Sequence, residues 1–333
     1  MPCVSLDSND TRFFPLFLLE VARRKGACYP DHVMPTRVRY DRLPTEQCCP
    51  ASRDLDRLSV TGLLRLMSRE DARAVRAVAT QHHQIARAIR LTVASLRRGG
   101  RLIFVGAGTS GRLGVLEAAE WPPTFSTPAS LVQALIAGGR GAVFRSREGA
   151  EDRRADARLA IAARVRRPDV VVGIAASGVT PFVDEALREA RRLGARTILV
   201  TGHPRPRIRA HVTIPLAVGP EILTGSTRLK TATATKLVLN MLTLGVMVRL
   251  GKTYGNLMVD VRPSSHKLRA RALAIVQTLT RSSRASAAAA LRQARGRAKV
   301  AVVMASLGLA APEAVRRLMR TQGSLRQALR ARA

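Results

Sequence analysis

A short glycine-rich segment after an apolar run constrains this chain most strongly. Leu102–Val105 is apolar and of strand length, and Gly-Ala-Gly-Thr-Ser-Gly-Arg follows it at 106–112. A strand that enters such a turn and then a helix gathers backbone N–H groups at the positive end of the helix, where they favour an anion such as phosphate. Thr109 and Ser110 add hydroxyl donors there. The segment alone predicts either a phosphate-binding turn or a plain strand–helix connection, because it lacks the Walker pattern.

Two further segments with Ser or Thr beside Gly favour the phosphate interpretation. The segment 177–181 follows an apolar run, and the segment 219–230 precedes a long helix that we expect Ser226 and Thr227 to cap. Cations are disfavoured at a helix N-terminus unless an anion offsets them, so the basic residues that follow Thr227 also predict a bound anion. We assign phosphate binding to Ser110, Ser177, Ser226 and Thr227, with Thr109, Thr180, Arg228 and Lys230 as helpers.

Apolar runs and helical segments alternate along the chain. Strands are predicted at 101–105, 131–136, 169–175, 197–200 and 212–216, and Trp121-Pro-Pro is expected to end the helix after the first glycine-rich segment. This alternation predicts an α/β fold with a parallel sheet and right-handed crossovers, whose ligands lie beyond the carboxyl ends of the strands. We expect an irregular extension at 1–43, a sheet domain with N-terminal helices at 44–262, and a small helical bundle at 263–333.

The net charge of the chain is +33, from 56 basic and 23 acidic residues. Such a balance is compatible with a nucleic-acid partner. However, the arginines are spread through every predicted helix, and aromatic residues are only 3% of the chain, so there is no platform for stacking bases. We interpret most arginines as solvated helix faces and expect no nucleic-acid partner.

The cysteines predict neither a metal site nor a disulfide framework. Cys3, Cys28, Cys48 and Cys49 all fall near the N-terminus, without the paired spacing of a zinc site. We expect no metal or other cofactor, and a cysteine-free core fits the reducing cytoplasm. The apolar run Leu237–Val248 is too short to span a membrane, and no signal peptide is recognised, so we expect a cytoplasmic protein without a membrane partner.

Several segments together carry a more specific signal than any one of them. They are the glycine-rich segment 106–114, Glu-Trp-Pro-Pro-Thr-Phe at 120–125, Glu-Gly-Ala-Glu-Asp at 148–152, Gly-Ile-Ala-Ala-Ser-Gly at 173–178, the segment 219–230 and Tyr-Gly-Asn-Leu-Met-Val-Asp at 254–260. In this order they resemble the bacterial N-acetylmuramic acid 6-phosphate etherases, which have the sugar isomerase (SIS) fold and are related to the glucokinase regulatory protein. The segment 219–236 resembles both, whereas Glu120 and Glu151 favour the etherase.

The resemblance implies a reaction of cell-wall amino sugar recycling. The D-lactyl ether of N-acetylmuramic acid 6-phosphate would be cleaved to N-acetylglucosamine 6-phosphate and D-lactate, without a metal or redox cofactor. The ring-opened sugar would lose its C2 proton, lactate would leave from C3, and water would then add. A homodimer with active sites near the subunit interface is also implied. A non-catalytic sugar-phosphate-binding regulator on the same fold and a phosphosugar isomerase are the alternatives.

Elimination needs two acid/base groups, one for the C2 proton and one for the ether oxygen. The resemblance assigns proton donation to Glu120 and makes Glu151 the second acid/base residue. Apolar neighbours of Glu120, including Trp121, fit a general acid, while the run at 148–152 could equally be a solvated helix start. The chain departs from the family pattern at Glu117, where Asp is usual, and at Val179, where Arg is usual.

Overall fold

The computed structural model describes residues 38–261 and 263–330. The predicted extension at 1–43 therefore lies mostly outside the described residues, together with Cys3 and Cys28. Contacts divide the chain after Val38, and residues from Arg39 onward form one unit. This unit begins with short 3₁₀ turns, η1 (Tyr40–Arg42), η2 (Pro44–Glu46), η3 (Pro50–Ser52) and η4 (Leu55–Arg57).

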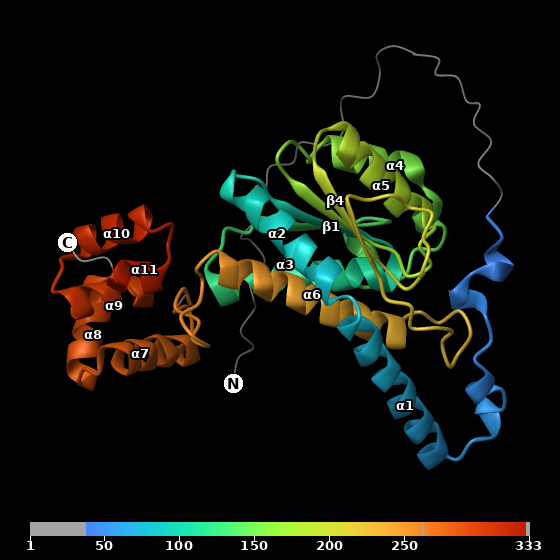
Figure 1. Ribbon diagram of the computed structural model, residues 1–333, viewed down its shortest axis with the longest axis horizontal. Helices are drawn as coiled ribbons and strands as arrows, with labels where there is room; N and C mark the ends of the chain where they lie inside the picture. Colours follow the sequence, from blue (N-terminus) through green and yellow to red (C-terminus); the bar gives the residue numbers. More distant parts are fainter. Residues whose placement is uncertain (1–37, 262, 331–333) are drawn as a thin grey trace, which may run out of the picture. The chain divides into compact units, whose positions relative to one another are not determined.

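A parallel five-stranded sheet forms the centre of the fold, as predicted (Figure 1). Its strands are β1 (Leu102–Gly106), β2 (Val132–Ile136), β3 (Val170–Ile174), β4 (Arg196–Thr201) and β5 (Val212–Pro215), in the order β2-β1-β3-β4-β5. Gly106 lies opposite Ile136 on one side and Ile174 on the other. The carboxyl ends of these three strands are therefore level, which is where a parallel sheet binds its ligands.

Helices cover both faces of the sheet because its strands are apolar on both sides. The helices α1 (Val60–Ala79), α2 (His82–Arg97), α3 (Gly108–Phe125) and α6 (Lys230–Arg249) share one core with Leu102 and Phe104 of β1. The helices α4 (Arg154–Ala162) and α5 (Pro181–Arg192) share the other core with Ile103 and Val105 (Figure 1). Alternate residues of β1 thus face opposite layers, as the two-residue period of a strand requires.

Helix α3 extends beyond its predicted end. It begins at Gly108 and passes through Pro122 and Pro123 to Phe125, so the expectation that Trp121-Pro-Pro ends it is wrong. Trp121 and Phe125 are buried and pack edge to face with their ring centroids 6.4 Å apart, which holds the last turn on the core. The helix ends at Ser126, which has a left-handed φ of 52° and donates its N–H to the carbonyl of Pro122.

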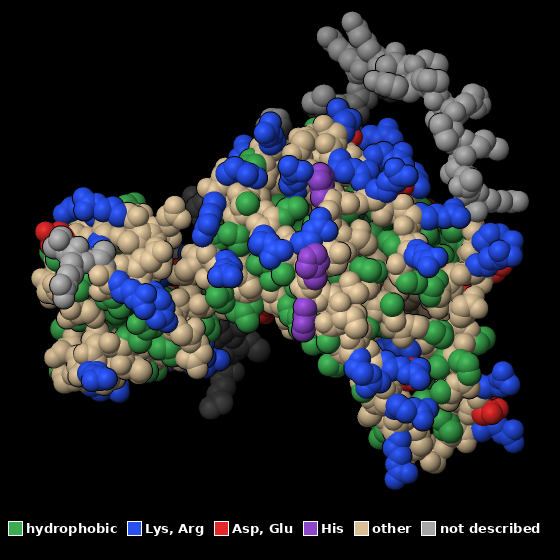
Figure 2. Space-filling model, in the orientation of Figure 1, with side chains coloured by type: hydrophobic (Ala, Val, Ile, Leu, Met, Phe, Trp, Pro, Cys, Tyr) green, Lys and Arg blue, Asp and Glu red, His purple; other side chains and the backbone are tan. Residues whose placement is uncertain are grey.

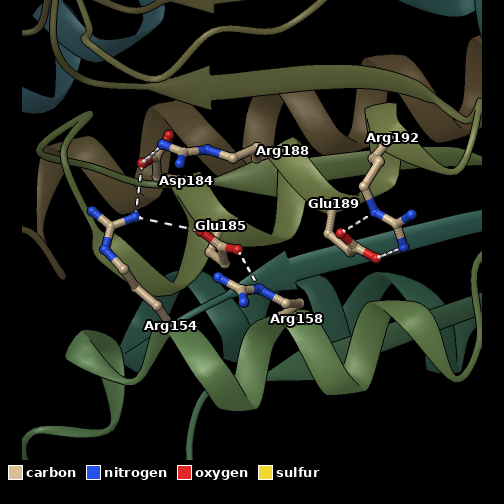
Figure 3. Close-up of polar contacts among 7 residues, drawn as sticks. All are labelled: Arg154, Arg158, Asp184, Glu185, Arg188, Glu189 and Arg192. Atoms are coloured by element: carbon tan, nitrogen blue, oxygen red, sulfur yellow. Dashed lines mark hydrogen bonds and ion pairs between the residues drawn. The ribbon is translucent and has the colours of Figure 1, made fainter. Parts of the chain in front are cut away.

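Arginines on the α4 and α5 surface are neutralised by acidic residues of α5 (Figure 3). Asp184 accepts hydrogen bonds from Arg154 and Arg188, and Glu185 accepts one from Arg158. Hydrogen bonds from Arg192 lower the pKa of Glu189. The arginine side chains of these pairs are 43–68% exposed, which fits the interpretation of solvated helix faces. Figure 2 shows other basic side chains scattered over the visible face, with few acidic ones between them.

The C-terminal helices have an apolar core of their own. They are α7 (His266–Thr280), α8 (Arg284–Gln293), α9 (Ala298–Leu307), α10 (Ala311–Arg320) and α11 (Leu325–Arg330), of which α7 is not predicted from the sequence. Lys299 of α9 donates to Asp260 and to the carbonyls of Gly251 and Gly323, so it joins the bundle to the segment after α6. A separate domain from residue 263 stays a prediction.

Helix α6 is the long helix predicted after the segment 219–230, and it extends beyond the apolar run Leu237–Val248. By length and composition it could cross a membrane, yet 50% of that stretch is buried inside the fold. It packs there against α1, α2 and α3. These contacts are those of a core helix, which commonly has the same apolar composition.

Candidate active site

A pocket of about 260 Å³ lies at the carboxyl ends of β1 and β3. Each of the three predicted segments contributes to its lining: Thr109 and Ser110 follow β1, Ser177 and Thr180 follow β3, and Thr227 precedes α6. The hydroxyl groups that the sequence places in distant segments therefore line one pocket. Glu151 of the turn η6 (Ala150–Asp152) lies in the same lining.

The turn between β1 and α3 has the geometry of an anion site. A Cβ atom on Gly106 would lie 2.7 Å from the backbone nitrogen of Gly111, so glycine is required for this close approach. Gly108 has a φ of +51°, which glycine adopts readily. Within the described part of the chain, no side chain caps α3 at Ala107, which leaves the first-turn N–H groups available to a ligand beside the Ser110 hydroxyl.

The segment before α6 caps that helix in an unexpected way. The carboxylate of Glu221 accepts hydrogen bonds from the backbone N–H groups of Lys230 at 3.2 Å and Thr231 at 2.9 Å. The prediction that Ser226 and Thr227 cap α6 is therefore wrong, because the helix begins after Leu229 and a more distant carboxylate takes that role. Thr227 instead lines the pocket, whereas Ser226 and Arg228 are not in its lining.

Lys230 lies apart from the pocket in a buried ion pair. Its ammonium group is 2.6 Å from the carboxylate of Glu70 on α1, and both side chains are 2% exposed. The anion that offsets this cation near the helix start is therefore a pair of protein carboxylates, Glu70 and Glu221, instead of a ligand. This arrangement does not support a role for Lys230 in phosphate binding.

The two carboxylates assigned to acid/base chemistry are not brought together within one chain. Glu151 is half-buried in the pocket lining, whereas Glu120 is exposed and outside it. Ser110 and Glu120 lie on the same helix, about 15 Å apart along its axis at a rise of about 1.5 Å per residue. The expected apolar enclosure of Glu120 is therefore wrong for a single chain.

Near Glu120, the departure at Glu117 is buried in a polar network between α3 and α6. Its carboxylate accepts a hydrogen bond from the hydroxyl of Thr243 at 2.9 Å and pairs with the ammonium group of Lys236. Lys236 also donates to Asn240 at 2.7 Å. The longer Glu side chain is thus fully partnered, so it fixes α3 against α6 without an uncompensated charge.

Some residues of the pocket lining are missed by the sequence analysis. Arg112 and Arg147 supply cations, and Glu148, which accepts from Ser146 at 2.8 Å, supplies a further carboxylate. Arg112 is the last residue of the first glycine-rich segment, so its position could have predicted that it lines the pocket. Thr45 and Glu46 come from η2, far earlier in the chain, where no sequence pattern points to the pocket.

The pocket thus combines hydroxyl and N–H donors for an anion with carboxylates that can accept hydrogen bonds or move protons. Among the described residues, no group of three or more His, Cys, Asp or Glu side chains is placed to hold a metal ion.

Comparison with known proteins gives the family. The model of the glucokinase regulatory protein N-terminal SIS domain matches residues 84–191. The N-acetylmuramic acid 6-phosphate etherase of Picosynechococcus sp. is 50% identical over 291 residues, which cover 86% of this chain and 97% of that relative. The etherases of Nostoc sp. and Cutibacterium acnes are 53% and 52% identical, each over 86% of this chain and over 94% and 95% of the relative.

The chain belongs to the N-acetylmuramic acid 6-phosphate etherase family. The resemblance expected from the sequence segments is thereby confirmed, and these relatives are covered almost from end to end. Solved structures similar to this chain include a phosphoheptose isomerase from Francisella tularensis, 17% identical with a TM-score of 0.43 over 57% of this chain and 98% of that chain. A phosphosugar isomerase from Bacteroides fragilis is 19% identical with a TM-score of 0.44, over 56% and 91% respectively.

Proposed function

We propose that this protein cleaves the D-lactyl ether of N-acetylmuramic acid 6-phosphate, giving N-acetylglucosamine 6-phosphate and D-lactate. The observation that carries the proposal is the 50% identity to a named etherase over 97% of that relative. The pocket supports it, because hydroxyl donors from three segments surround an uncapped helix N-terminus, where a sugar phosphate would be held.

The substrate phosphate is proposed to bind Ser110, Ser177 and Thr227, with Thr109 and Thr180 as further donors. All of these residues line the pocket. Arg112 and Arg147 supply positive charge in the same lining, whereas the usual cation of the family is replaced by Val179. Ser226, Arg228 and Lys230 are left out of this proposed set because they lie outside the lining.

Two carboxylates share the proposed chemistry. In the ring-opened sugar the C1 aldehyde acidifies the C2 proton, which Glu151 removes. The electron pair forms the C2–C3 double bond as the C3–O bond breaks, and Glu120 gives a proton to the departing lactate oxygen. Water then adds at C3 of the unsaturated aldehyde, and a proton returns to C2. Glu151 lies in the pocket lining and is half-buried, which supports its role.

We infer a homodimer in which each pocket receives Glu120 from the second copy. The exposure of Glu120 and its position outside the lining support this arrangement, since one chain alone does not unite it with Glu151. The cytoplasm is the proposed compartment, which the free thiols of Cys48 and Cys49 favour.

The first test is D-lactate release from N-acetylmuramic acid 6-phosphate by the purified protein. We expect turnover by the wild type and a loss of about 10²-fold or more in Glu151→Gln and in Glu120→Gln, the usual scale for an acid/base group. Asp152→Asn is the matched control, because Asp152 is exposed, adjacent to Glu151 and outside the pocket lining, and it should retain turnover.

A wild type that binds the phosphosugar without releasing lactate would contradict the proposal. That result would favour a non-catalytic sugar-phosphate-binding regulator, to whose SIS domain residues 84–191 are similar.

A further inference from the structure

Glu46 is a carboxylate of the pocket lining that neither the phosphate site nor the proposed acid/base pair uses. It ends the short turn η2, well before the first helix of the sheet domain. Its side chain is exposed to the pocket, and one carboxylate oxygen, Oε1, accepts a hydrogen bond from the hydroxyl of Thr45 at 2.8 Å. Among the described residues, Oε2 accepts no hydrogen bond, so it is open to a ligand.

The loop before α6 fixes Glu46 in this position. Gly225 donates its N–H to the carbonyl oxygen of Thr45 at 3.0 Å, and Thr45 is 5% exposed. A Cβ atom on Gly225 would lie 3.3 Å from Glu46 Oε2, and Gly225 has a φ of +79°. The backbone and the carboxylate of η2 are thus both positioned against a loop that brings Thr227 to the same pocket. The backbone of η2 is thus anchored beside the pocket, and the exposed Glu46 side chain lies in the pocket lining.

Charge determines which part of a phosphosugar Glu46 can contact. A carboxylate repels phosphate, which the uncapped N-terminus of α3 and the nearby hydroxyl groups attract. An ionised carboxylate accepts hydrogen bonds and donates none, so its partners must be O–H or N–H donors. The sugar part of the substrate carries such donors in its hydroxyl groups and its acetamido group.

We propose that Glu46 is a substrate-binding residue, whose Oε2 accepts hydrogen bonds from the hydroxyl or acetamido N–H groups of the sugar. The inference rests on the proposed function for the identity of the sugar. It assigns a sugar contact to a segment that precedes α1, whereas the proposed phosphate donors lie in the loops after β1 and β3 and, with Thr227, before α6.

The test compares the affinity for two probes by calorimetric titration, N-acetylglucosamine 6-phosphate and inorganic phosphate. Loss of a hydrogen bond to a charged group lowers affinity about tenfold or more, so Glu46→Gln should bind the phosphosugar at least about tenfold more weakly. Its affinity for inorganic phosphate should equal that of the wild type. Ser110→Ala should bind both probes more weakly than the wild type. Glu46→Asp, which keeps the charge, should recover part of the phosphosugar affinity.

Asp41→Asn is the control for the N-terminal segment, because Asp41 pairs with Arg39 and lies outside the lining; it should bind both probes normally. Equal phosphosugar affinity in Glu46→Gln and wild type would overturn the inference. So would parallel losses for both probes, which indicate a structural role for Glu46. The assay needs no turnover, so a wild type that binds the phosphosugar but releases no lactate refutes the proposed function separately. No phosphosugar binding by the wild type would overturn both.

Discussion

The ammonium group of Lys230 lies 2.6 Å from the carboxylate of Glu70, and each side chain is 2% exposed. A buried ion pair costs much to break, because the remaining charge keeps its desolvation penalty without its partner. Arg73 is a second partner of Glu70, but its side chain is 52% exposed and contributes less. At the residue scale, burial thus gives Lys230 a structural role, while Arg112 and Arg147 remain at the pocket.

We predict that Lys230→Met lowers the free energy of unfolding by about 3–5 kcal/mol, the usual cost of leaving one buried charge unpaired. The double variant Lys230→Met with Glu70→Met should recover most of this loss, because no buried charge is left unpaired and Arg73 is solvated. Urea unfolding measures both. The folded double variant should bind N-acetylglucosamine 6-phosphate like the wild type; a clear loss of affinity would instead make Lys230 a ligand-binding residue.

At the scale of secondary-structure elements, hydrogen bonds of His211 help to hold the edge strand β5 on β4. His211 lies directly before β5, and its ring Nδ1 accepts a hydrogen bond from the backbone N–H of Thr197 in β4 at 3.1 Å. The backbone N–H of His211 donates to the carbonyl of Thr197 at 3.0 Å. Burial, and then the guanidinium groups of Arg196 and Arg191, lower the pKa of His211 below 6.5. The neutral ring therefore belongs to the folded state, because a protonated Nδ1 cannot accept this bond.

The pH dependence of stability follows from this lowered pKa. The unfolded chain binds more protons at His211 than the folded chain does, so the contribution is complete above the unfolded pKa and is lost as the pH falls towards the folded pKa. We predict that the wild type loses more stability than His211→Asn between about pH 7.5 and 5.5, since Asn keeps an acceptor without titrating. Urea unfolding at both pH values tests this, with His82→Asn at the exposed start of α2 as control. Equal losses in wild type and His211→Asn would contradict the prediction.

Local patterns predict the elements that surround the pocket, whereas long-range contacts decide which residues reach it. The strands and the turn at 106–112 follow from apolar runs and glycine positions close together in the sequence. The capping of α6 by Glu221 and the pairing of Lys230 with Glu70, which is 160 positions away, depend on tertiary packing. For the same reason Glu46 is not predicted, because the hydrogen bond from Gly225 to the neighbouring Thr45 joins distant segments of the chain.

At the scale of the whole molecule, the proposed homodimer answers the separation of Glu120 from the pocket. A symmetric pair of subunits places the same surface of each copy against the other, so each pocket could take Glu120 from its partner. The separation of Glu120 and Glu151 within one chain supports this assembly, and it also makes the assembly testable by mixing inactive variants.

We predict that Glu120→Gln and Glu151→Gln, each inactive alone, regain activity when they are unfolded and refolded together. Random pairing makes half of the dimers mixed, and each mixed dimer has one pocket with both carboxylates intact, so about one quarter of wild-type lactate release should return. Each variant refolded alone is the control. No recovery, despite mixed dimers detected by mass spectrometry, would place both carboxylates of a site in one chain.

Because distant segments form the pocket, it can form only late in the synthesis of the chain. Ser110 and Thr227, which both line the pocket, are about 120 residues apart in the chain. At roughly 5–20 residues per second, a ribosome therefore adds Thr227 about 6–24 s after Ser110. During that interval β1 and the start of α3 exist without the loop that holds Glu46 and Thr227 in place. Under the proposed function, the pocket is therefore incomplete until synthesis has passed Thr227, and the sugar phosphate can stabilise only chains that have reached that point.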